Sequence, residues 1–353
     1  AVVIGLSVLL SEIVSKSKST SAQGLTSSSP STLSALHKEE DSCYQHSIAG
    51  ANKLIYEPSD IAIDDDKSLL LVPSGERIMA HSTNPVKAVR EVGRVKHSDM
   101  EGLVIIDGTR IFALSEWSGP GMVPGLLEFK WDGDTLLLIK VWQPDEPHRI
   151  GEGLAYFVDS NGQGTFAIDL LDDMALFEVP EPVSEPSDDP KQTAGLLVRK
   201  GSLNKVLLIS GLEDGRIAGM YTFEGNLYIL HDNDGVIRSW DLENGEMLAE
   251  IPTPIPMSPG RQNQWEGLAI EPYRQDFPGL LLHQSESKMT TTSTSSLRGR
   301  SGSVPSSSPS SASKRLIVHM GLDTPPQLWS FVVEEDPTQR GHLIFPSCAG
   351  GAK

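Results

Sequence analysis

The stretch HSDMEGLVIIDGTRIFALSEW, from His97 to Trp117, holds two short apolar runs separated by a polar turn that contains Asp and Gly. Two apolar runs joined in this way are typical of a β-hairpin. The phrase Glu-Gly-Leu that opens the first run, at residues 101–103, returns at residues 152–154 and 266–268. The stretch is therefore one copy of a repeat, and the repeat determines the architecture.

Five units of this kind are legible, each with a short apolar run, a polar turn and two further apolar runs. They begin at Ser59, Glu101, Glu152, Ala218 and Glu266. Helical spacing of apolar residues is not sustained in any of them. Recurrence at a period near fifty residues is the signature of β-propeller blades. The sequence predicts an all-β fold, a single β-propeller with five or six blades, and residues 196–211 are the segment that would supply a sixth. A sandwich or a β-helix is the competing all-β architecture.

The chain outside these units divides by composition. The apolar start at residues 1–14 is predicted to be the remnant of a secretory signal or an anchor, with a hydrophobic end or an edge strand as the alternative. The Ser/Thr-rich residues 15–42 are expected to form a disordered leader. The propeller is assigned to residues 43–350, and the low-complexity residues 289–314 are expected to be a surface insertion within it. We expect an extracellular or secretory protein, anchored to the membrane if the apolar start is retained.

Charge and cysteine content limit the partners and the compartment. Lys+Arg of 29 and Asp+Glu of 47 give a net charge of 29 − 47 = −18. This charge would repel phosphate backbones, so no nucleic-acid partner is expected. The two cysteines, Cys43 and Cys348, lie near opposite ends of the predicted propeller, where a disulfide would suit a ring that closes on itself. Two free thiols are the alternative.

The repeated phrase predicts a cluster of acids. In a blade the innermost strand runs along the central channel and the second strand returns antiparallel to it, so the start of one lies beside the end of the other. Acids from separate blades would then gather at one mouth of the channel. The expected pairs are Glu101 with Glu116, Glu152 with the segment from Asp169 to Asp173, and Glu266 with Glu286. The candidate metal ligands are Glu101, Glu116, Glu152, Asp169, Glu266 and Glu286.

The glycine after each of these glutamates has a predicted structural role. Gly102, Gly153 and Gly267 are expected to permit close backbone approach where inner strands crowd the axis. The converging carboxylates would raise each other's pKa values unless a cation neutralises them. Oxygen ligands of variable geometry suit Ca²⁺ better than a transition metal. In the alternative, each glutamate accepts hydrogen bonds from backbone amides of the neighbouring blade.

The segments SDMEGLVIIDGTRIFALSEW and QWEGLAI followed by GLLLHQSES resemble the repeat of the phytase-like propellers, which include β-propeller phytases and the proteins named "esterase-like activity of phytase". The resemblance covers residues 57–335. It implies Ca²⁺ at one channel mouth, where the ion bridges acidic side chains and a substrate phosphate and activates a water as nucleophile. By motif match it extends to Glu101, Glu152 and Glu266, with Glu116 and Glu286 as the acids of the second strands.

A phosphatase of this kind also needs basic groups near the phosphate. The motifs themselves contain none, although Arg77, Arg149 and Arg261 lie nearby in expected loops. His148 and His231, near the ends of their units, are weak candidates for proton carriers in ester or lactone hydrolysis, and the alternative is an ordinary loop histidine.

Two functions remain open from the sequence. One is a secreted, calcium-dependent hydrolase that acts on a phosphate monoester or ester as a monomer. The other is a non-catalytic propeller that binds a protein or a glycan, in which any calcium has a structural role.

Overall fold

The computed structural model describes residues 42–48, 56–83, 89–116, 124–144, 150–170, 173–183, 194–203, 216–231, 234–254, 265–274, 277, 313–322, 326–346 and 348. These residues belong to the unit that runs from Glu39 to Lys353. The predicted apolar start, residues 15–41 of the predicted leader, and residues 289–312 of the predicted insertion lie outside the described residues. Within the described residues, no helix is long and apolar enough to cross a membrane.

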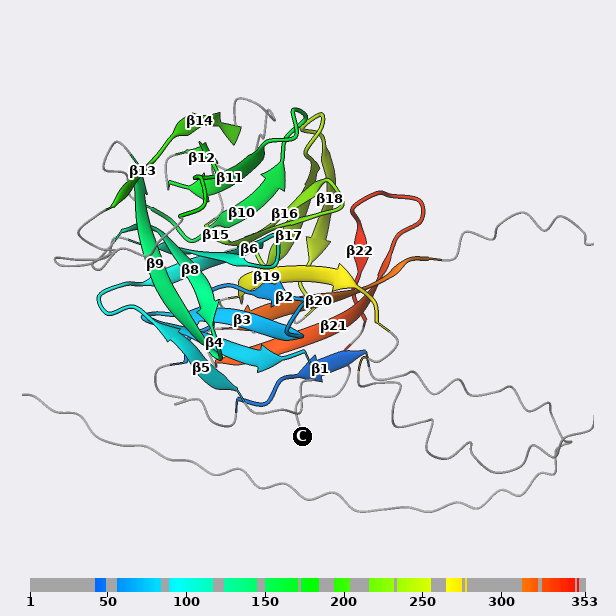
Figure 1. Ribbon diagram of the computed structural model, residues 1–353. Helices are drawn as coiled ribbons and strands as arrows, with labels where there is room; N and C mark the ends of the chain where they lie inside the picture. Colours follow the sequence, from blue (N-terminus) through cyan, green and yellow to red (C-terminus); the bar gives the residue numbers. More distant parts are fainter. Residues whose placement is uncertain are drawn as a thin grey trace, which may run out of the picture. The chain divides into compact units, whose positions relative to one another are not determined.

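The described strands form five sheets, so the predicted all-β propeller is confirmed with five blades (Figure 1). Blade 1 holds β2 (Ala62–Asp64), β3 (Leu69–Ser74), β4 (Arg77–Ser82) and β5 (Arg90–Arg94). Blade 2 holds β6 (Met100–Ile106), β7 (Arg110–Ser115), β8 (Gly125–Asp132), β9 (Thr135–Pro144) and β13 (Gly195–Leu197). Blade 3 holds β10 (Leu154–Val158), β11 (Gly164–Asp169), β12 (Met174–Glu178) and β14 (Arg199–Ser202).

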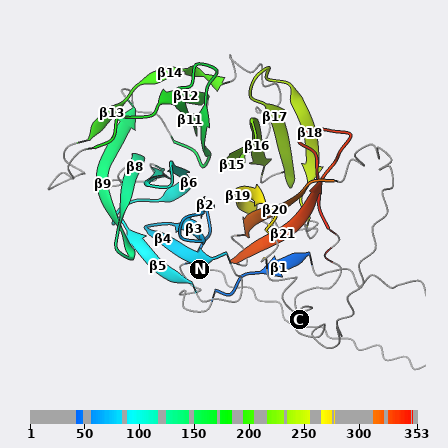
Figure 2. The same cartoon turned by 45° about the vertical axis from the view of Figure 1, so that its right-hand side comes forward.

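Blades 4 and 5 complete the ring. Blade 4 holds β15 (Ile217–Phe223), β16 (Asn226–His231), β17 (Val236–Asp241) and β18 (Met247–Pro252). Blade 5 holds β19 (Trp265–Pro272), β20 (Arg315–Leu322), β21 (Gln327–Glu335), the N-terminal β1 (Cys43–Gln45) and the short β22 (Leu343–Ile344). The inner strands contact one another in the cyclic order β2, β6, β10, β15, β19 and back to β2, and Figure 2 shows the sheets arranged around this axis.

The hydrophobic core is divided among the blade interfaces. One cluster of buried apolar side chains lies between each pair of neighbouring blades, so five clusters follow one another around the ring. For example, Ile111 of β7 packs in the cluster shared with blade 1, whereas the next residue, Phe112, packs in the cluster shared with blade 3. This alternation of side chains along a strand lets each sheet pack on both faces.

The ring closes through β1, which pairs antiparallel with β21 and so supplies the outer strand of the last blade from the other end of the propeller. A disulfide between Cys43 and Cys348 covalently joins the same two regions. The sequence left open a disulfide or two free thiols for these cysteines, and the structure contains the disulfide.

The described part of the segment that would have supplied a sixth blade is shared by two existing blades. Strand β13 pairs in parallel with β9 at the outer edge of blade 2. Only one residue further along, β14 pairs antiparallel with β12 at the outer edge of blade 3. The described residues form five sheets, and the described part of this segment supplies outer strands to two of them, while residues 204–211 lie outside the described residues.

The prediction for the second strand of blade 5 was wrong. The expected partner of the inner strand was the segment that ends near Glu286. In the structure β19 pairs with β20 instead, and Gly321 is the residue opposite Glu266. The expected pairing of Glu266 with Glu286 is therefore wrong, and Glu286 itself lies outside the described residues.

The glycines of the repeated phrase lie where neighbouring inner strands approach each other. A Cβ added at Gly102 would lie 2.6 Å from the Cβ of Leu154 in the next blade. One added at Gly267, where φ is +74°, would lie 2.5 Å from the Cα of Asp60 across the closure of the ring. The predicted crowding at the axis is confirmed at both positions, because these distances leave no room for a side chain.

Candidate metal centre

The glutamate of the repeated phrase in blade 2 lies at an irregularity of the inner strand. The register between β6 and β7 shifts between Met100 and Gly102, which makes Glu101 the extra residue of a β-bulge. A bulge changes the direction in which a side chain points, and bulges are frequent beside functional sites. Glu101 is partly buried at the start of the strand. The start of the inner strand therefore places a carboxylate at the channel mouth.

Two further carboxylates flank Glu101. Asp99 precedes the same strand, and Glu116 follows β7, which is its hairpin partner. The backbone amide of Glu116 donates to the carbonyl of Asp99 at 2.8 Å, which holds the two ends of the hairpin together. One oxygen from each of Asp99, Glu101 and Glu116 lies within 4.8 Å of the others. The predicted approach of Glu116 to Glu101 is confirmed, and Asp99 is the member that the sequence analysis missed.

The charge state of Glu101 reflects its surroundings. Its pKa is raised to about 8, first by burial and then by the negative charges of Asp99 and Glu152, while a hydrogen bond from Ser59 acts in the opposite direction. In the absence of a cation, burial and the neighbouring acids therefore favour the protonated form of Glu101. A bound divalent cation would reverse this, because opposite charge favours the ionised carboxylate.

Glu152, the equivalent residue of blade 3, has an oppositely charged neighbour. Its carboxylate forms an ion pair with Arg216, which directly precedes the inner strand of blade 4. The expected neighbour of Glu152 is also present, since the amide of Gly151 donates to the carbonyl of Asp169 and the amide of Asp169 donates to the carbonyl of Gly153, at 2.8 and 2.9 Å. The backbone of Asp169 is therefore hydrogen-bonded to the residues on both sides of Glu152, and Asp169 belongs to the segment that the sequence predicted to face this glutamate.

Two of the six predicted acids, Glu101 and Glu116, lie in one cluster with Asp99. Among the described residues, the group whose carboxylate oxygens converge is Asp99, Glu101 and Glu116. Glu152 is near enough to raise the pKa of Glu101, whereas Glu266 is not among the groups that do so. Within the described residues, the cluster therefore belongs to blade 2, with Glu152 of blade 3 beside it.

None of the basic residues and histidines that the sequence singled out is seen beside the acidic cluster within the described residues. Arg149, Arg261 and His148 lie outside the described residues, and Arg77 forms an ion pair with Glu91 at 3.3 Å. Arg216, which no motif marks, is the basic residue beside the acids. His231 is completely buried in blade 4, with its ring near that of Trp240, so its position does not favour proton exchange with a substrate.

The donor set fits a hard cation. Three carboxylates supply oxygen ligands only, which is the preference of Ca²⁺, and backbone carbonyls or water would complete its six to eight ligands. The thiol and imidazole ligands that transition metals favour are not among the three residues. A contact of the kind that the predicted alternative describes, an acid that accepts a hydrogen bond from an amide of the next blade, is made by Asp60, whose Oδ2 accepts from the Leu103 amide.

Fold and site together define a five-bladed propeller with an acidic centre at one end of the channel. No known protein-family profile matches the chain, and no curated protein matches it. Solved structures that resemble it include a glutaminyl cyclase from Myxococcus xanthus, with 14% identity, a TM-score of 0.45, and coverage of 83% of this chain and 95% of that one. A putative gluconolactonase has 12% identity, a TM-score of 0.39, and coverage of 86% and 93%.

The periplasmic gluconolactonase of Pseudomonas aeruginosa also resembles the chain, with 15% identity, a TM-score of 0.33, and coverage of 56% and 54%. Similarity at this level does not establish a family or an activity. The residues of the site are therefore the guide to function.

Proposed function

We propose that this protein is a calcium-dependent hydrolase of phosphate monoesters or carboxylic esters, with its centre at Asp99, Glu101 and Glu116. The observation that carries the proposal is the convergence of three carboxylates within 4.8 Å on one hairpin. Such a cluster is electrostatically unfavourable alone and favourable around a divalent cation.

The chemistry follows from the cation that the cluster would hold. Bound calcium would make a water molecule more acidic and neutralise charge that develops on the substrate. Asp99 and Glu116 would hold the ion from the two ends of the hairpin. Glu101 would lose its proton when the ion binds and would then serve as a third ligand.

Arg216 supports an anionic substrate. Its guanidinium lies beside Glu152 at the same mouth, and half of its side chain is exposed. A guanidinium fits the geometry of phosphate and carboxylate oxygens with paired hydrogen bonds. A phosphate monoester at the cation would thus find the basic group that the sequence motifs lack.

A second candidate function is a non-catalytic propeller with a structural cation, which binds a protein or a glycan. The ion pair of Glu152 with Arg216 favours it, because a neutralised acid beside the cluster is also what a purely structural arrangement would contain. The two functions differ in turnover, and both predict binding of calcium.

The test combines binding and turnover. Titration calorimetry of chelator-treated protein with CaCl₂ should give one binding event, and Asp99→Asn or Glu116→Gln should weaken it by about 100-fold. Chromogenic phosphate, ester and lactone substrates should be hydrolysed only with calcium present. Glu250→Gln, an exposed acid of β18 paired with Arg238, is the matched control and should change neither result.

Calcium binding without turnover of any substrate would leave the structural role. The absence of calcium binding would reject both forms of the proposal.

We also propose that the protein acts outside the cytosol as a monomer. The disulfide between Cys43 and Cys348 supports an oxidising compartment, because such bridges persist there and are reduced in the cytosol. Mass measurement of the secreted protein before and after reduction would test the bridge and the oligomeric state.

A further inference from the structure

A second concave site lies at the other end of the inner strands. The acidic centre lies where β6 starts, whereas this groove is lined by the ends of β10 and β15 and by the turns that follow them. Its volume of about 920 Å³ belongs to the size range of small-molecule sites. The groove lies between blades 3 and 4, and residues of blade 2 are not part of its lining.

Two ion pairs line the groove. Lys200 Nζ lies 2.9 Å from Asp159 Oδ2, and it also donates to Thr165 Oγ1 at 3.2 Å. Arg340 donates to Asp241 Oδ2 at 2.6 Å. Each pair offers donors and acceptors side by side while its charges cancel. The groove therefore presents strong hydrogen-bonding groups with little net charge from these pairs.

The carboxylates of both pairs are held in fixed positions. The amides of Asn161 and Gln163 both donate to Asp159 Oδ1 at 2.9 Å, and the amide of Glu243 donates to Asp241 Oδ1 at 2.8 Å. Because their own turns orient them, these carboxylates would lose little freedom when a ligand binds.

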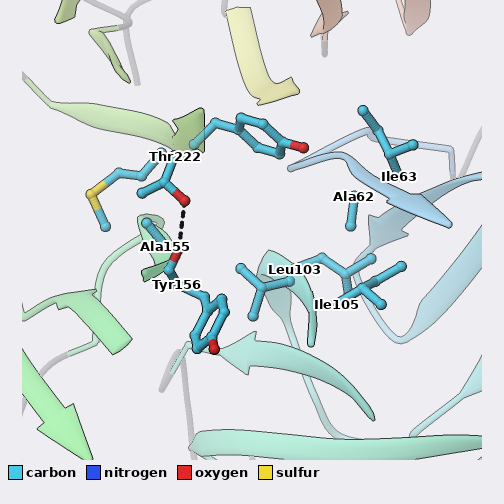
Figure 3. Close-up of a pocket in the computed structure, with 10 residues that line it drawn as sticks. Ala62, Ile63, Leu103, Ile105, Ala155, Tyr156 and Thr222 are labelled. Carbon is cyan, nitrogen blue, oxygen red and sulfur yellow. Dashed lines mark hydrogen bonds between the residues drawn. The ribbon is translucent and has the colours of Figure 1, made fainter. Parts of the chain in front are cut away.

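Apolar and aromatic surface accompanies these polar groups. Tyr156, Phe157 and Phe223, all partly buried, line the groove. The hydroxyl of Thr222 donates to the carbonyl of Tyr156 at 2.5 Å, which ties β15 to β10 where the groove meets the central channel (Figure 3). Aromatic rings provide flat, apolar surface on which the C–H face of a ligand can lie.

The charge pattern selects among ligand classes. The two cations of the groove are already paired, and the protein carries a net charge of −18, so an anion gains little here. At the rim, Glu224 is paired with Lys314, which leaves Glu243 as an exposed carboxylate. A ligand with many hydroxyl groups uses adjacent donors and acceptors without bringing charge, and its hydroxyls need partners once they leave water.

We propose that the groove between blades 3 and 4 binds a neutral saccharide, through the Lys200–Asp159 and Arg340–Asp241 pairs and the neighbouring aromatic side chains. This site is separate from the acidic centre. The saccharide would be held on the opposite side of the propeller from the proposed hydrolytic chemistry.

Titration calorimetry with maltotriose, cellotriose and chitotriose as probes tests the proposal. At least one of them should bind with a Kd of about 1 mM or tighter. Lys200→Met and Arg340→Met should each weaken that binding by about tenfold, since each removes charge-assisted hydrogen bonds. Arg90→Met, which removes a similarly exposed arginine of blade 1 paired with Asp134 of blade 2, should leave it unchanged.

Three results would overturn the proposal. The first is no binding of any of the three trisaccharides. The second is that both groove variants, with unchanged melting temperatures, bind the saccharide as tightly as the wild type does. The third is tighter binding of spermine than of every saccharide. Chelator-treated protein should bind the saccharide with the same Kd as calcium-loaded protein. This last comparison separates a failure of the groove from a failure of the metal centre.

Discussion

Asp60 of blade 1 accepts a 2.6 Å hydrogen bond from the backbone amide of Leu103 in blade 2, and its carboxyl group is buried beside the propeller axis. Burial raises its pKa well above the ordinary value, although the amides of Leu103, Ile61 and Leu268 act in the opposite direction. A buried acid of one blade thus holds the inner strand of the next, directly beside the acidic centre.

Replacement of Asp60 should separate its hydrogen bond from its charge. Asp60→Asn keeps an oxygen for the Leu103 amide, whereas Asp60→Ala leaves this buried amide without its partner. We expect Asp60→Ala to lower the free energy of unfolding by about 2 kcal/mol and Asp60→Asn to change it much less. Urea denaturation followed by fluorescence measures both, and equal losses in the two variants would contradict the assignment.

Glu101 should make the metal-free protein less stable as pH rises. Its folded pKa, about 8, lies above its ordinary value of 4.5, so its favourable contribution is complete below 4.5 and is lost as pH rises through 8. The side chain of Glu101→Gln cannot ionise. At pH 9 the free energy of unfolding of this variant should exceed that of chelator-treated wild type by about 2 kcal/mol. Thermal unfolding between pH 5 and 9 measures this, with Glu250→Gln as control; a wild-type curve parallel to that of Glu101→Gln would refute it.

A buried histidine cluster should contribute to acid unfolding. His81 accepts or donates a 2.7 Å hydrogen bond with the Tyr56 hydroxyl, and burial lowers its pKa to about 3. The pKa of His46 is lowered as well, first by burial and then by His319 and His81. Histidines that are neutral when folded and have an ordinary pKa of 6.5 favour folding above 6.5, and this stability is lost as pH falls from there towards 3.

The measurement is the free energy of unfolding between pH 7 and 4 for wild type and His81→Gln. The variant should lose some stability at pH 7 and show a smaller further decrease towards pH 4. His97→Gln, which replaces an exposed histidine, serves as control. An unchanged pH dependence in His81→Gln would show that this residue does not titrate on unfolding.

The disulfide should contribute strongly to stability. Its two cysteines are separated by 305 positions, so the bridge restricts a long loop of the unfolded chain. Replacing both Cys43 and Cys348 by Ser should lower the free energy of unfolding by about 6 kcal/mol in the chain-entropy account. Urea denaturation of oxidised wild type, reduced wild type and the double variant tests this. Agreement between oxidised and reduced wild type would contradict it.

Close packing at the axis should make one glycine irreplaceable. Gly102→Ala would place its Cβ 2.6 Å from that of Leu154 and 3.3 Å from the carbonyl oxygen of Glu152, so a strand must shift. We expect a loss of about 2 kcal/mol or more in the free energy of unfolding. Gly201→Ala, whose Cβ would meet no atom within 4 Å, is the control. Similar melting temperatures for the two variants would count against crowding.

The sequence predicted the propeller and part of the site because both depend on local pairing. The approach of Glu116 to Glu101 follows from an antiparallel hairpin with a short turn of three residues between the paired Ile106 and Arg110, in which Asp107 and Gly108 both have positive φ. Asp99 lies only two residues before Glu101, and the repeated phrase did not include it.

The remaining differences come from contacts that local patterns do not encode. The strand partner of Glu266 follows a long separation in the chain, and a nearer apolar segment matched the repeat equally well. Arg216 reaches Glu152 only because blades 3 and 4 are neighbours in the ring. The histidine cluster likewise joins residues of β4 and β20 with His46, which follows β1.

The position of β1 in the last blade has a consequence for biosynthesis. A ribosome completes blades 1 to 4 before β21 is made, and during that time the N-terminal strand has no partner. Until β21 emerges, β1 is an unpaired strand of the kind that associates with other chains, and nascent copies are exposed to this risk. Translation speed and chaperone supply should therefore affect the yield of this protein more than that of a propeller whose blades are each formed from consecutive strands.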